Sequence, residues 1–281
     1  MARVTIAELT DRKRRGEPIT MLTAYDYPMA RLLDGAGLDV ILVGDSLGMV
    51  VLGYDSTTPV TMDEMIHHAK AARRGVSNAL LIGDMPFLSF RGSVDEAVKN
   101  AARFIQEAGC EGVKVEWKPG IEDAAKAIID AGIPVMGHVG LTPQTAAAEG
   151  GFGMRGMDAE SASRIFAQAI SLQDVGCFAM VLECIPDVLA QTITTRLTIP
   201  TIGIGSGPHC DGQVVVTHDL LGLFDRFTPK FVKRYADVGS AIREAAVAYI
   251  RDVKSGVFPG SLHTRTMPAE ERRKLDAELG A

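Results

Sequence analysis

Ionisable side chains stand at the ends of several apolar, strand-like runs of this chain. In 40-VILVGDS-46, four apolar residues lead through a glycine into a carboxylate and a hydroxyl. A charge at the mouth of a buried strand costs solvation free energy unless a partner compensates for it. The same pattern recurs along the chain and singles out Asp45, Ser46, Asp84, Lys114, Glu116, His138 and Glu183.

The carboxylates in this set are suited to a metal ion. Hard oxygen ligands favour Mg²⁺ or a similar cation, which keeps several coordination positions for water and substrate. Zinc more often recruits two or three His or Cys residues. We therefore predict a Mg²⁺ site at Asp45, Asp84 and Glu116. Such an ion accepts the oxygens of a bidentate ligand, for example a 2-oxo acid, and withdraws electrons from it.

Glu183 is the predicted general base. It ends the very apolar run 178-FAMVLE-183, where loss of solvent makes a carboxylate a better proton acceptor. Lys114 and Glu116 are two residues apart on one strand, so both side chains are expected to point inward. Two inward charges on one strand require partners in a crowded interior.

Each of these residues also has a purely structural interpretation. Asp45 and Asp84 are possible N-caps of the helices that follow them. Lys114 with Glu116 is a possible structural ion pair, and an isolated histidine such as His138 is often a hydrogen-bonded core residue. Ionisable groups on successive strand ends favour a functional site over these interpretations, because such ends share one face of a barrel.

A recurring phrase defines the elements that position these residues. A helical pattern, a small residue and a glycine precede a strand, as in 108-AGCEGVKVE-116 and 131-AGIPVMGH-138. Glycine suits the position after a helix, and repeated αβ units imply a parallel sheet. We predict an α/β fold, a (β/α)₈ barrel, with an open doubly wound sheet as the alternative. The predicted strands are 20–25, 38–44, 79–84, 112–116, 133–138, 177–183, 200–205 and 230–234, and the clearest helices are 61–74, 93–109, 120–132, 158–176, 186–197 and 237–253, with N-caps at Thr61, Ser93 and Asp158.

The segment 202-IGIGSGPHCDGQ-213 is rich in glycine. It matches neither a dinucleotide-binding fingerprint nor a P-loop, since Pro208 replaces the third glycine and no lysine follows. It is either a close approach of backbone to a ligand or a turn that needs positive φ.

Composition bounds the remaining possibilities. The 281 residues are 47% hydrophobic and carry a net charge of −6, so a nucleic-acid partner is not expected. The basic run 11-DRKRRG-16 is predicted to be a solvated helix end. Four cysteines without a CxxC pair, no signal-like N-terminus and no apolar membrane-length run predict a cytoplasmic protein that does not bind a membrane. We predict one domain over 1–281, with residues 257–281 as a peripheral tail.

Together these stretches resemble the ketopantoate hydroxymethyltransferase family (3-methyl-2-oxobutanoate hydroxymethyltransferase). The similar segments span most of residues 20 to 240. They are VGDSLGMV, GDMPF, VKVE, PVMGHVGLTPQ, VLECIP, TIGIGSGPHCDGQVVVTHDLLG and PKFVKRYAD.

The resemblance implies a barrel of the phosphoenolpyruvate/pyruvate superfamily type, Mg²⁺ dependence and a homo-oligomer, typically a decamer. It implies transfer of a hydroxymethyl group from 5,10-methylenetetrahydrofolate to 3-methyl-2-oxobutanoate through a Mg²⁺-stabilised enolate. The product is 2-dehydropantoate, on the route to pantothenate. The resemblance also implies roles for individual residues: Asp45 and Asp84 hold the metal with Glu116 close by, Ser46 and Lys114 contact the 2-oxo acid, His138 borders it, and Glu183 removes its C3 proton.

Two segments depart from the family pattern. Trp117 and Lys118 stand where the family has two small residues, and Arg155 replaces a neutral polar residue. The first departure affects the loop after the fourth strand, and the second affects expected folate contacts. The alternatives are another Mg²⁺-dependent 2-oxo-acid lyase or aldolase of the same superfamily, and a non-catalytic metabolite-binding barrel.

Overall fold

A computed structural model describes residues 3–146 and 150–280 of the chain. The contacts divide it into two compact units. The first comprises residues 1–220 together with 224–233, and the second comprises residues 221–223 together with 234–281.

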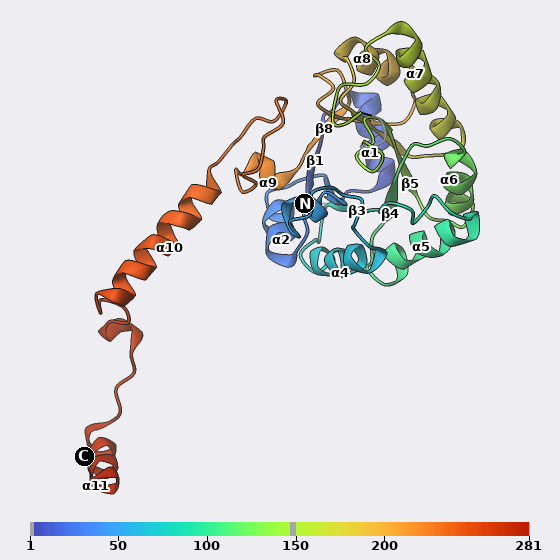
Figure 1. Ribbon diagram of the computed structural model, residues 1–281. Helices are drawn as coiled ribbons and strands as arrows, with labels where there is room; N and C mark the ends of the chain where they lie inside the picture. Colours follow the sequence, from blue (N-terminus) through green and yellow to red (C-terminus); the bar gives the residue numbers. More distant parts are fainter. Residues whose placement is uncertain (1–2, 147–149, 281) are drawn as a thin grey trace. The chain divides into compact units, whose positions relative to one another are not determined.

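The first unit is built on a closed barrel of parallel strands (Figure 1). Each strand pairs with the next in sequence, and β8 pairs with β1. The predicted (β/α)₈ barrel is confirmed, and the open-sheet alternative is wrong. The strands are β1 Ile19–Thr23, β2 Val40–Val43, β3 Leu80–Asp84, β4 Gly112–Glu116, β5 Val135–Gly140, β6 Ala179–Glu183, β7 Thr201–Ile204 and β8 Gly212–Val215.

The eighth strand was predicted at the wrong place. Residues 212–215 form it, overlapping the end of the segment interpreted as a glycine-rich loop, whereas residues 230–234 form no strand. The run 213-QVVV-216 is short and follows a segment with four glycines, so the turn residues obscured a β-branched strand. Ile19 of β1 pairs in register with Gly212, which closes the barrel.

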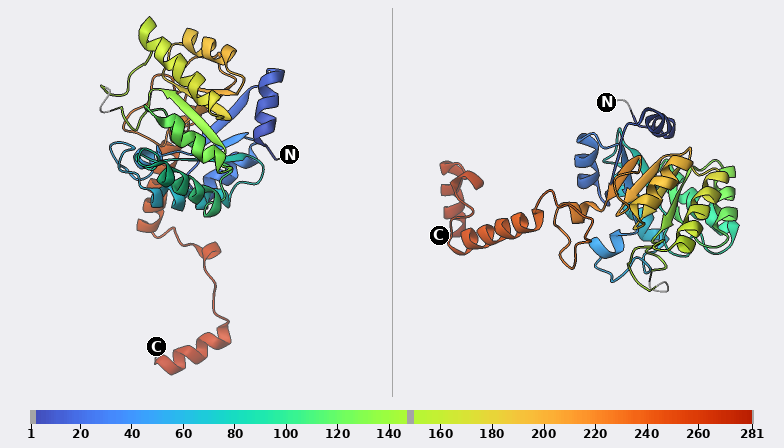
Figure 2. Two further views of the ribbon diagram at one scale, coloured as in Figure 1. Left: turned by 90° about the vertical axis from the view of Figure 1, so that its right-hand side faces the viewer. Right: turned by 90° about the horizontal axis from the view of Figure 1, so that it is seen from above.

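Helices cover the outside of the strands, as the two further views in Figure 2 show. The predicted N-caps are confirmed: Thr61, Ser93 and Asp158 each accept a hydrogen bond from the backbone N–H three residues on. The helices of this unit are α1 Ile6–Arg15, α2 Tyr27–Gly35, α3 Leu47–Val50, α4 Met62–Arg73, α5 Val94–Gln106, α6 Ile121–Asp130, α7 Ala159–Asp174, α8 Asp187–Arg196 and α9 Thr217–Leu220.

Two apolar layers follow from the alternation of side chains along each strand. Val113 and Val115 of β4 pack outward against the helices, in a cluster that also contains Phe104 of α5. Met21, Val40 and other residues fill the barrel interior. The side chains between Val113 and Val115 therefore point inward, as predicted for Lys114 and Glu116.

Helix α1 covers one end of the barrel interior. Its Leu9 belongs to the interior apolar cluster. Arg12 lies 2.6 Å from Asp39, and Lys13 lies 2.7 Å from Asp211. The basic run is thus a helix end, as predicted, but two of its side chains are partly buried in ion pairs.

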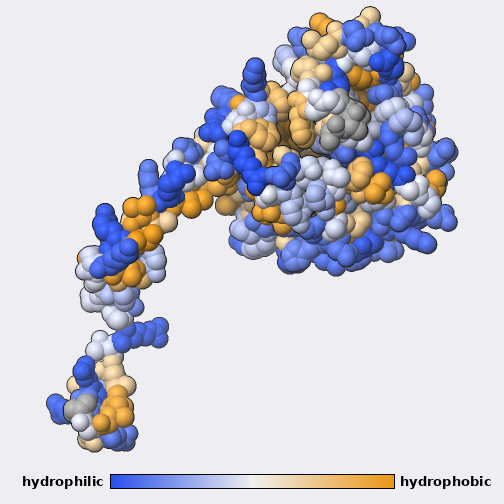
Figure 3. All heavy atoms as spheres, viewed as in Figure 1, coloured by the Kyte–Doolittle hydropathy of each residue, from blue (hydrophilic) through white to orange (hydrophobic). Residues whose placement is uncertain are grey.

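The second unit contains α10 Val238–Lys254, a short 3₁₀ turn Ser261–His263 and α11 Ala269–Leu279. The predicted helix 237–253 is confirmed by α10. Neither α10 nor α11 has a buried residue, and hydrophobic side chains are exposed along α10 (Figure 3). This unit contains the predicted tail, residues 257–281, but begins before it. The organisation of the chain as one domain stays a prediction. No helix in the described part of the chain is long and apolar enough to span a membrane.

Candidate active site at the barrel mouth

A cavity of about 630 Å³ opens at the carboxyl ends of the strands. All the residues singled out from the sequence line it. Strand register explains why they meet: Asp84 pairs with Lys114, Glu116 with His138, and Gly140 with Glu183. The cavity therefore collects the predicted site in one place. The seven residues are Asp45, Ser46, Asp84, Lys114, Glu116, His138 and Glu183.

Lys114 is the central cation of this site. Its Nζ lies 2.8 Å from Asp84 Oδ1 and 3.3 Å from His138 Nδ1. Burial alone would lower the pKa of Lys114, but the surrounding carboxylates, Asp84 foremost, outweigh burial and raise it. Lys114 is therefore a buried ammonium ion. Its close partner is Asp84, so the proposed structural pair with Glu116 is not the main contact.

Asp45 and Asp84 face the same space and cap no helix. Asp84 accepts a hydrogen bond from the backbone N–H of Asp45, at 3.1 Å. The residue before α3 is Ser46 and α5 is capped by Ser93, so the N-cap interpretation is wrong for both aspartates. Burial, followed by the charge of Asp84, raises the pKa of Asp45 to about 8. Without a bound cation, this pair of acids is more stable with one carboxylate ionised than with both.

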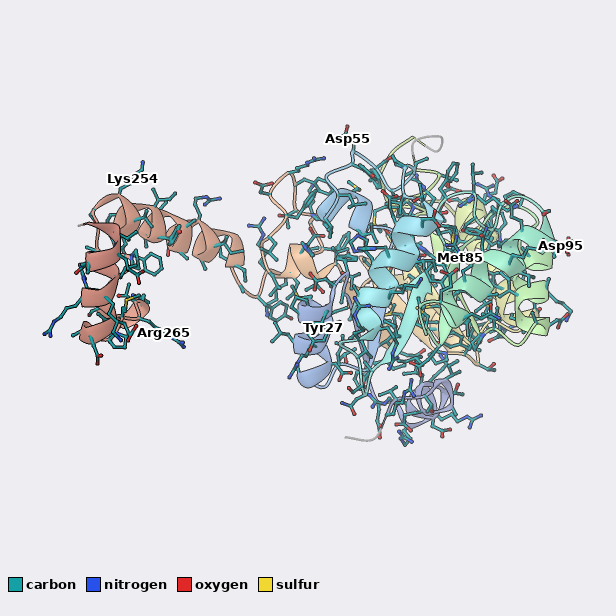
Figure 4. The ribbon with its side chains drawn as sticks, turned by 90° about the horizontal axis from the view of Figure 1, so that it is seen from below. Tyr27, Asp55, Met85, Asp95, Lys254 and Arg265 are labelled. Atoms are coloured by element: carbon teal, nitrogen blue, oxygen red, sulfur yellow. The ribbon has the colours of Figure 1, made fainter. Side chains whose placement is uncertain are left out.

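Gln144 is a site residue that the sequence reading did not select. Its side-chain Nε2 donates to Asp45 Oδ2 and to the carbonyl of Met85, each at 2.9 Å. Its backbone N–H donates to Glu116 Oε2 at 3.2 Å. Met85, labelled in Figure 4, lies among the elements of the barrel, whereas Asp55 and Asp95 point away from it. One buried residue thus orients two of the carboxylates, Asp45 through its side chain and Glu116 through its backbone.

Glu116 is the most enclosed of the acids. It is 1% exposed, and Arg91 lies 3.5 Å from its Oε2. Burial raises the pKa of Glu116 well above its usual value, and the charge of Lys114 opposes this only in part. Its Oε1 has no hydrogen-bond partner among the described residues. A buried oxygen without a partner can bind a cation or accept a hydrogen bond from a water molecule.

His138 connects Lys114 to Glu183. Its Nε2 lies 3.2 Å from Glu183 Oε2. Burial, followed by the charge of Lys114, lowers the pKa of His138, so the ring is neutral. An ammonium can only donate, so Nδ1 accepts from Lys114 and the ring proton resides on Nε2, facing Glu183. The ring therefore lies against the Glu183 carboxylate, with its Nε2–H side facing that group.

The backbone around Glu183 is tightly packed. Gly140 has φ 99°, and a Cβ there would lie 2.2 Å from the Glu183 carbonyl oxygen. The N–H of Leu141 donates to that oxygen at 2.8 Å. The side chain of Glu183 is 15% exposed, more than those of its neighbours, so it meets the open cavity.

Ser46 and Tyr25 form the opposite wall. Their hydroxyl groups lie 2.8 Å apart, and Tyr25 is 2% exposed. The sequence reading placed Tyr25 at a strand end without assigning it a role. Because the tyrosine holds its hydroxyl, Ser46 is a positioned polar group rather than a helix cap.

The two departures from the family pattern lie beside the cavity rather than in its lining. Trp117 packs against the outer apolar cluster, and neither it nor Lys118 lines the cavity. The Arg155 side chain donates to the Gly151 carbonyl at 2.8 Å, while Phe152 and Met154 line the cavity. The bulky loop after β4 therefore leaves the site open.

The glycine-rich segment provides turns with positive φ. Gly205 has φ 64° and Gly207 has φ 78°. Gly205 lines the cavity, and a Cβ there would lie 2.7 Å from the ring of Phe231. The turn interpretation is confirmed, and the close approach is to an aromatic side chain of this chain.

The acids fit a magnesium ion in a specific way. Within residues 3–146 and 150–280, no three His, Cys, Asp or Glu side chains form a ready-made metal cluster. Mg²⁺ does not need one, because it commonly binds one or two carboxylates and keeps water and substrate oxygens. Asp45 and Asp84 offer those carboxylates, and the unpartnered oxygen of Glu116 suits a water beside the ion.

Comparison with known sequences gives consistent results. A family model described as ketopantoate hydroxymethyltransferase matches residues 3–261. The 3-methyl-2-oxobutanoate hydroxymethyltransferase of Heliobacterium modesticaldum is 53% identical over 268 residues, covering 95% of this chain and 97% of that protein. The protein of the same name from Moorella thermoacetica is 56% identical over 263 residues, covering 94% and 98%.

Solved structures with low sequence identity share the fold. Phosphoenolpyruvate phosphomutase from Streptomyces platensis subsp. rosaceus gives a TM-score of 0.62 at 15% identity, covering 98% of this chain and 96% of that one. A 2,3-dimethylmalate lyase, described as a member of the PEP mutase/isocitrate lyase superfamily, gives 0.59 at 13% identity, covering 98% of both chains. These structures share the barrel fold of this chain.

Proposed function

The chain belongs to the ketopantoate hydroxymethyltransferase family, and we propose that the barrel mouth carries out that family's transfer reaction. In it, 5,10-methylenetetrahydrofolate supplies a one-carbon unit to 3-methyl-2-oxobutanoate, giving 2-dehydropantoate for pantothenate biosynthesis. The observation that carries the proposal is the Glu183 carboxylate, which lies 3.2 Å from neutral His138 at the open side of the site that contains Lys114. Sequence identities of 53% and 56% do not favour a different lyase or a non-catalytic barrel.

Each residue has a role that its contacts support. The ammonium of Lys114 attracts the carboxylate of the 2-oxo acid, and Ser46 donates to it from the opposite wall. Glu183 takes the C3 proton, and the contact with His138 at 3.2 Å limits the positions that its carboxylate can adopt. A divalent cation, for which we propose Mg²⁺ held by Asp45 and Asp84 with Glu116 nearby, would polarise the 2-oxo group and make the C3 hydrogen more acidic.

The atoms of the overall reaction balance with one water. The C3 carbon forms a bond to the methylene carbon of the folate, and water supplies the hydroxyl group. The two folate nitrogens that lose the methylene each gain a hydrogen, one originating from C3 and one from water. Glu183 is placed to pass the first of these on.

Further properties follow from the family resemblance and stay proposals. We propose that the protein is a homo-oligomer, a decamer, that works in the cytoplasm. The exposed apolar side chains of α10, such as Ile242 and Ile250, support association between copies.

An NMR time course in D₂O tests the function. It contains the protein, 3-methyl-2-oxobutanoate and Mg²⁺, first without and then with 5,10-methylenetetrahydrofolate, beside an EDTA control. We expect loss of the C3 proton signal only with metal, and new hydroxymethyl signals only with folate. A folded protein that shows neither change, with this 2-oxo acid, does not have the proposed function.

A further inference from the structure

The cavity has a second part that the 2-oxo acid does not use. The catalytic groups occupy the ends of β2 to β6, but the lining continues over β8, α9 and the segment 224–233. There the wall is largely apolar, includes the rings of Phe224, Phe227 and Phe231, and carries one carboxylate, Asp219. A short, branched 2-oxo acid fills only a small share of about 630 Å³, so space remains beside it for a larger molecule.

We propose that this second part is the folate subsite, in which the Asp219 carboxylate receives the amino-pyrimidinone edge of the pteridine. The inference rests on the proposed function, because it takes a reduced folate to be the second substrate. The ligand class is a flat 2-amino-4-oxopteridine with an anionic tail.

Asp219 is close to the reacting groups and on a different wall. It lies in α9, directly after β8, and is 8% exposed. Burial, with smaller contributions from the charges of Asp219 and Asp45, raises the pKa of Tyr25. The ring of His218, the residue before Asp219, lies 5.3 Å from the Tyr25 ring, and the Tyr25 hydroxyl contacts Ser46 at 2.8 Å. A ligand edge at Asp219 is therefore adjacent to the 2-oxo acid site.

The chemistry of Asp219 suits a pteridine better than a 2-oxo acid. The 2-amino group and the neighbouring ring N–H of a pteridine are parallel donors, and a carboxylate presents two matching acceptor oxygens. A 2-oxo acid is an anion, which Asp219 repels toward Lys114. The negative charge of Asp219 and the positive charge of Lys114 therefore favour binding of the two substrates on opposite sides of the cavity.

The aromatic wall suits flat rings. Phe224 is buried, but Phe152, Phe227 and Phe231 are 59%, 50% and 42% exposed while lining the cavity. Exposed aromatic faces at a cavity rim gain free energy when a planar ligand covers them. The exposed Lys230 also lines the cavity and is suited to the carboxylates of the folate tail.

This wall is held in place by contacts within the barrel unit. Phe231 packs against Gly205, which has no Cβ to obstruct it. Arg226 donates to the Gly53 carbonyl at 2.7 Å and to the Tyr54 carbonyl at 3.2 Å. The segment that carries the aromatic rings is thus tied to the loop after α3, so the subsite is largely formed before the ligand arrives.

Anaerobic calorimetry with tetrahydrofolate tests the proposal. Asp219→Asn should raise the Kd of tetrahydrofolate about ten- to a hundredfold, since a charge-assisted pair is lost. The matched control is Asp225→Asn, the same change at an exposed residue that does not line the cavity, with a Kd expected within about twofold of the parent. An equal effect of both variants, or no effect of Asp219→Asn, overturns the proposal.

An altered ligand tests the same contact without any change to the protein. The analogue in which methyl replaces the 2-amino group should bind the parent at least about tenfold more weakly than tetrahydrofolate. It should lose little more affinity in Asp219→Asn, because both changes remove the same contact. If the analogue binds the parent as tightly as tetrahydrofolate does, the carboxylate does not anchor the pteridine edge.

The C3-proton exchange without folate separates this proposal from the proposed function. If the parent exchanges the proton and Asp219→Asn weakens the 2-oxo acid as much as tetrahydrofolate, the subsite proposal is wrong and the function stands. If the parent binds tetrahydrofolate through Asp219 but never exchanges the proton or forms product, the function is wrong and the subsite stands.

Discussion

The two ends of the barrel treat buried charge in opposite ways. At the amino end of the strands, Asp39 accepts from the backbone and the hydroxyl of Thr20 and lies 2.6 Å from Arg12. Asp211 repeats this arrangement with Thr201 and Lys13. Each of these two acids has a base and a threonine as partners, which compensate for its charge.

At the carboxyl end, acids outnumber bases. Asp45, Asp84 and Glu116 all act on the single ammonium of Lys114, and burial raises the pKa of Asp45 and Glu116. The ion pairs at the amino end stabilise the closed barrel. The excess of acids at the carboxyl end instead indicates a site for ligands. Changes at the carboxyl end should therefore alter chemistry first, and changes at the amino end should alter stability first.

The largest effect is expected from replacing the proposed base, which should abolish the chemistry without altering the fold. Glu183→Gln keeps the shape and the hydrogen-bonding capacity of the side chain but removes the base. C3-proton exchange in D₂O should fall about a thousandfold, while 2-oxo acid and Mg²⁺ binding persist. Exchange at the parent rate in this variant would show that another group is the base.

The next prediction concerns the amino end. Asp39→Asn removes the ion pair with Arg12, which is partly exposed, and weakens the acceptor for Thr20. The free energy of unfolding should fall by about 2 kcal/mol, which lowers Tm by about 5 °C. Calorimetric scans give Tm, and the turnover of the variant at 25 °C should match the parent. A turnover defect without a change in Tm would contradict the division between the two ends.

Gln144→Leu tests how far the carboxyl end depends on one amide. Without its donor, Asp45 loses its orientation, and the Mg²⁺ affinity measured by calorimetry should fall about ten- to a hundredfold. The matched control is Gln213→Leu, because Gln213 contacts only the Gly207 carbonyl in the described hydrogen bonds and does not line the cavity. Equal Mg²⁺ affinities in the two variants would exclude the positioning role of Gln144.

The smallest effect is a pH dependence of metal binding. Without metal, Asp45 holds a proton below about pH 8, since its pKa is raised to about 8. A cation must displace that proton, so Mg²⁺ affinity should rise about fivefold from pH 7 to pH 8, about twofold more by about pH 9, and level off above that. Titration in two buffers with different ionisation enthalpies measures the released proton. A Kd and an enthalpy that do not vary with pH or buffer would show that Asp45 is already ionised.

The polar strand ends could be predicted from the sequence because each lies at the end of an apolar run. Asp84, Lys114, Glu116, His138 and Glu183 all fell on strands that the structure confirms. Their convergence followed from the barrel, in which parallel strands direct their carboxyl ends to one face.

The missed features depend on contacts that no local pattern encodes. Gln144 follows a loop proline, and its selection as a site residue requires its contact with Asp45, 99 residues away. β8 was missed because its short β-branched run adjoins turn residues, and pairing with β1 stabilises it. Asp219 lies beyond that strand, so the same error hid its place on the cavity wall.

Closure of the barrel also sets an order of events during synthesis. β1 pairs with β8, and Lys13 of α1 reaches Asp211. The first strand to leave the ribosome therefore keeps an open edge until almost two hundred further residues have been made. At about 5–20 residues per second, that interval lasts on the order of tens of seconds. During it, the edge of β1 that will pair with β8 stays exposed, so a chaperone that covers this edge should raise the yield of folded protein.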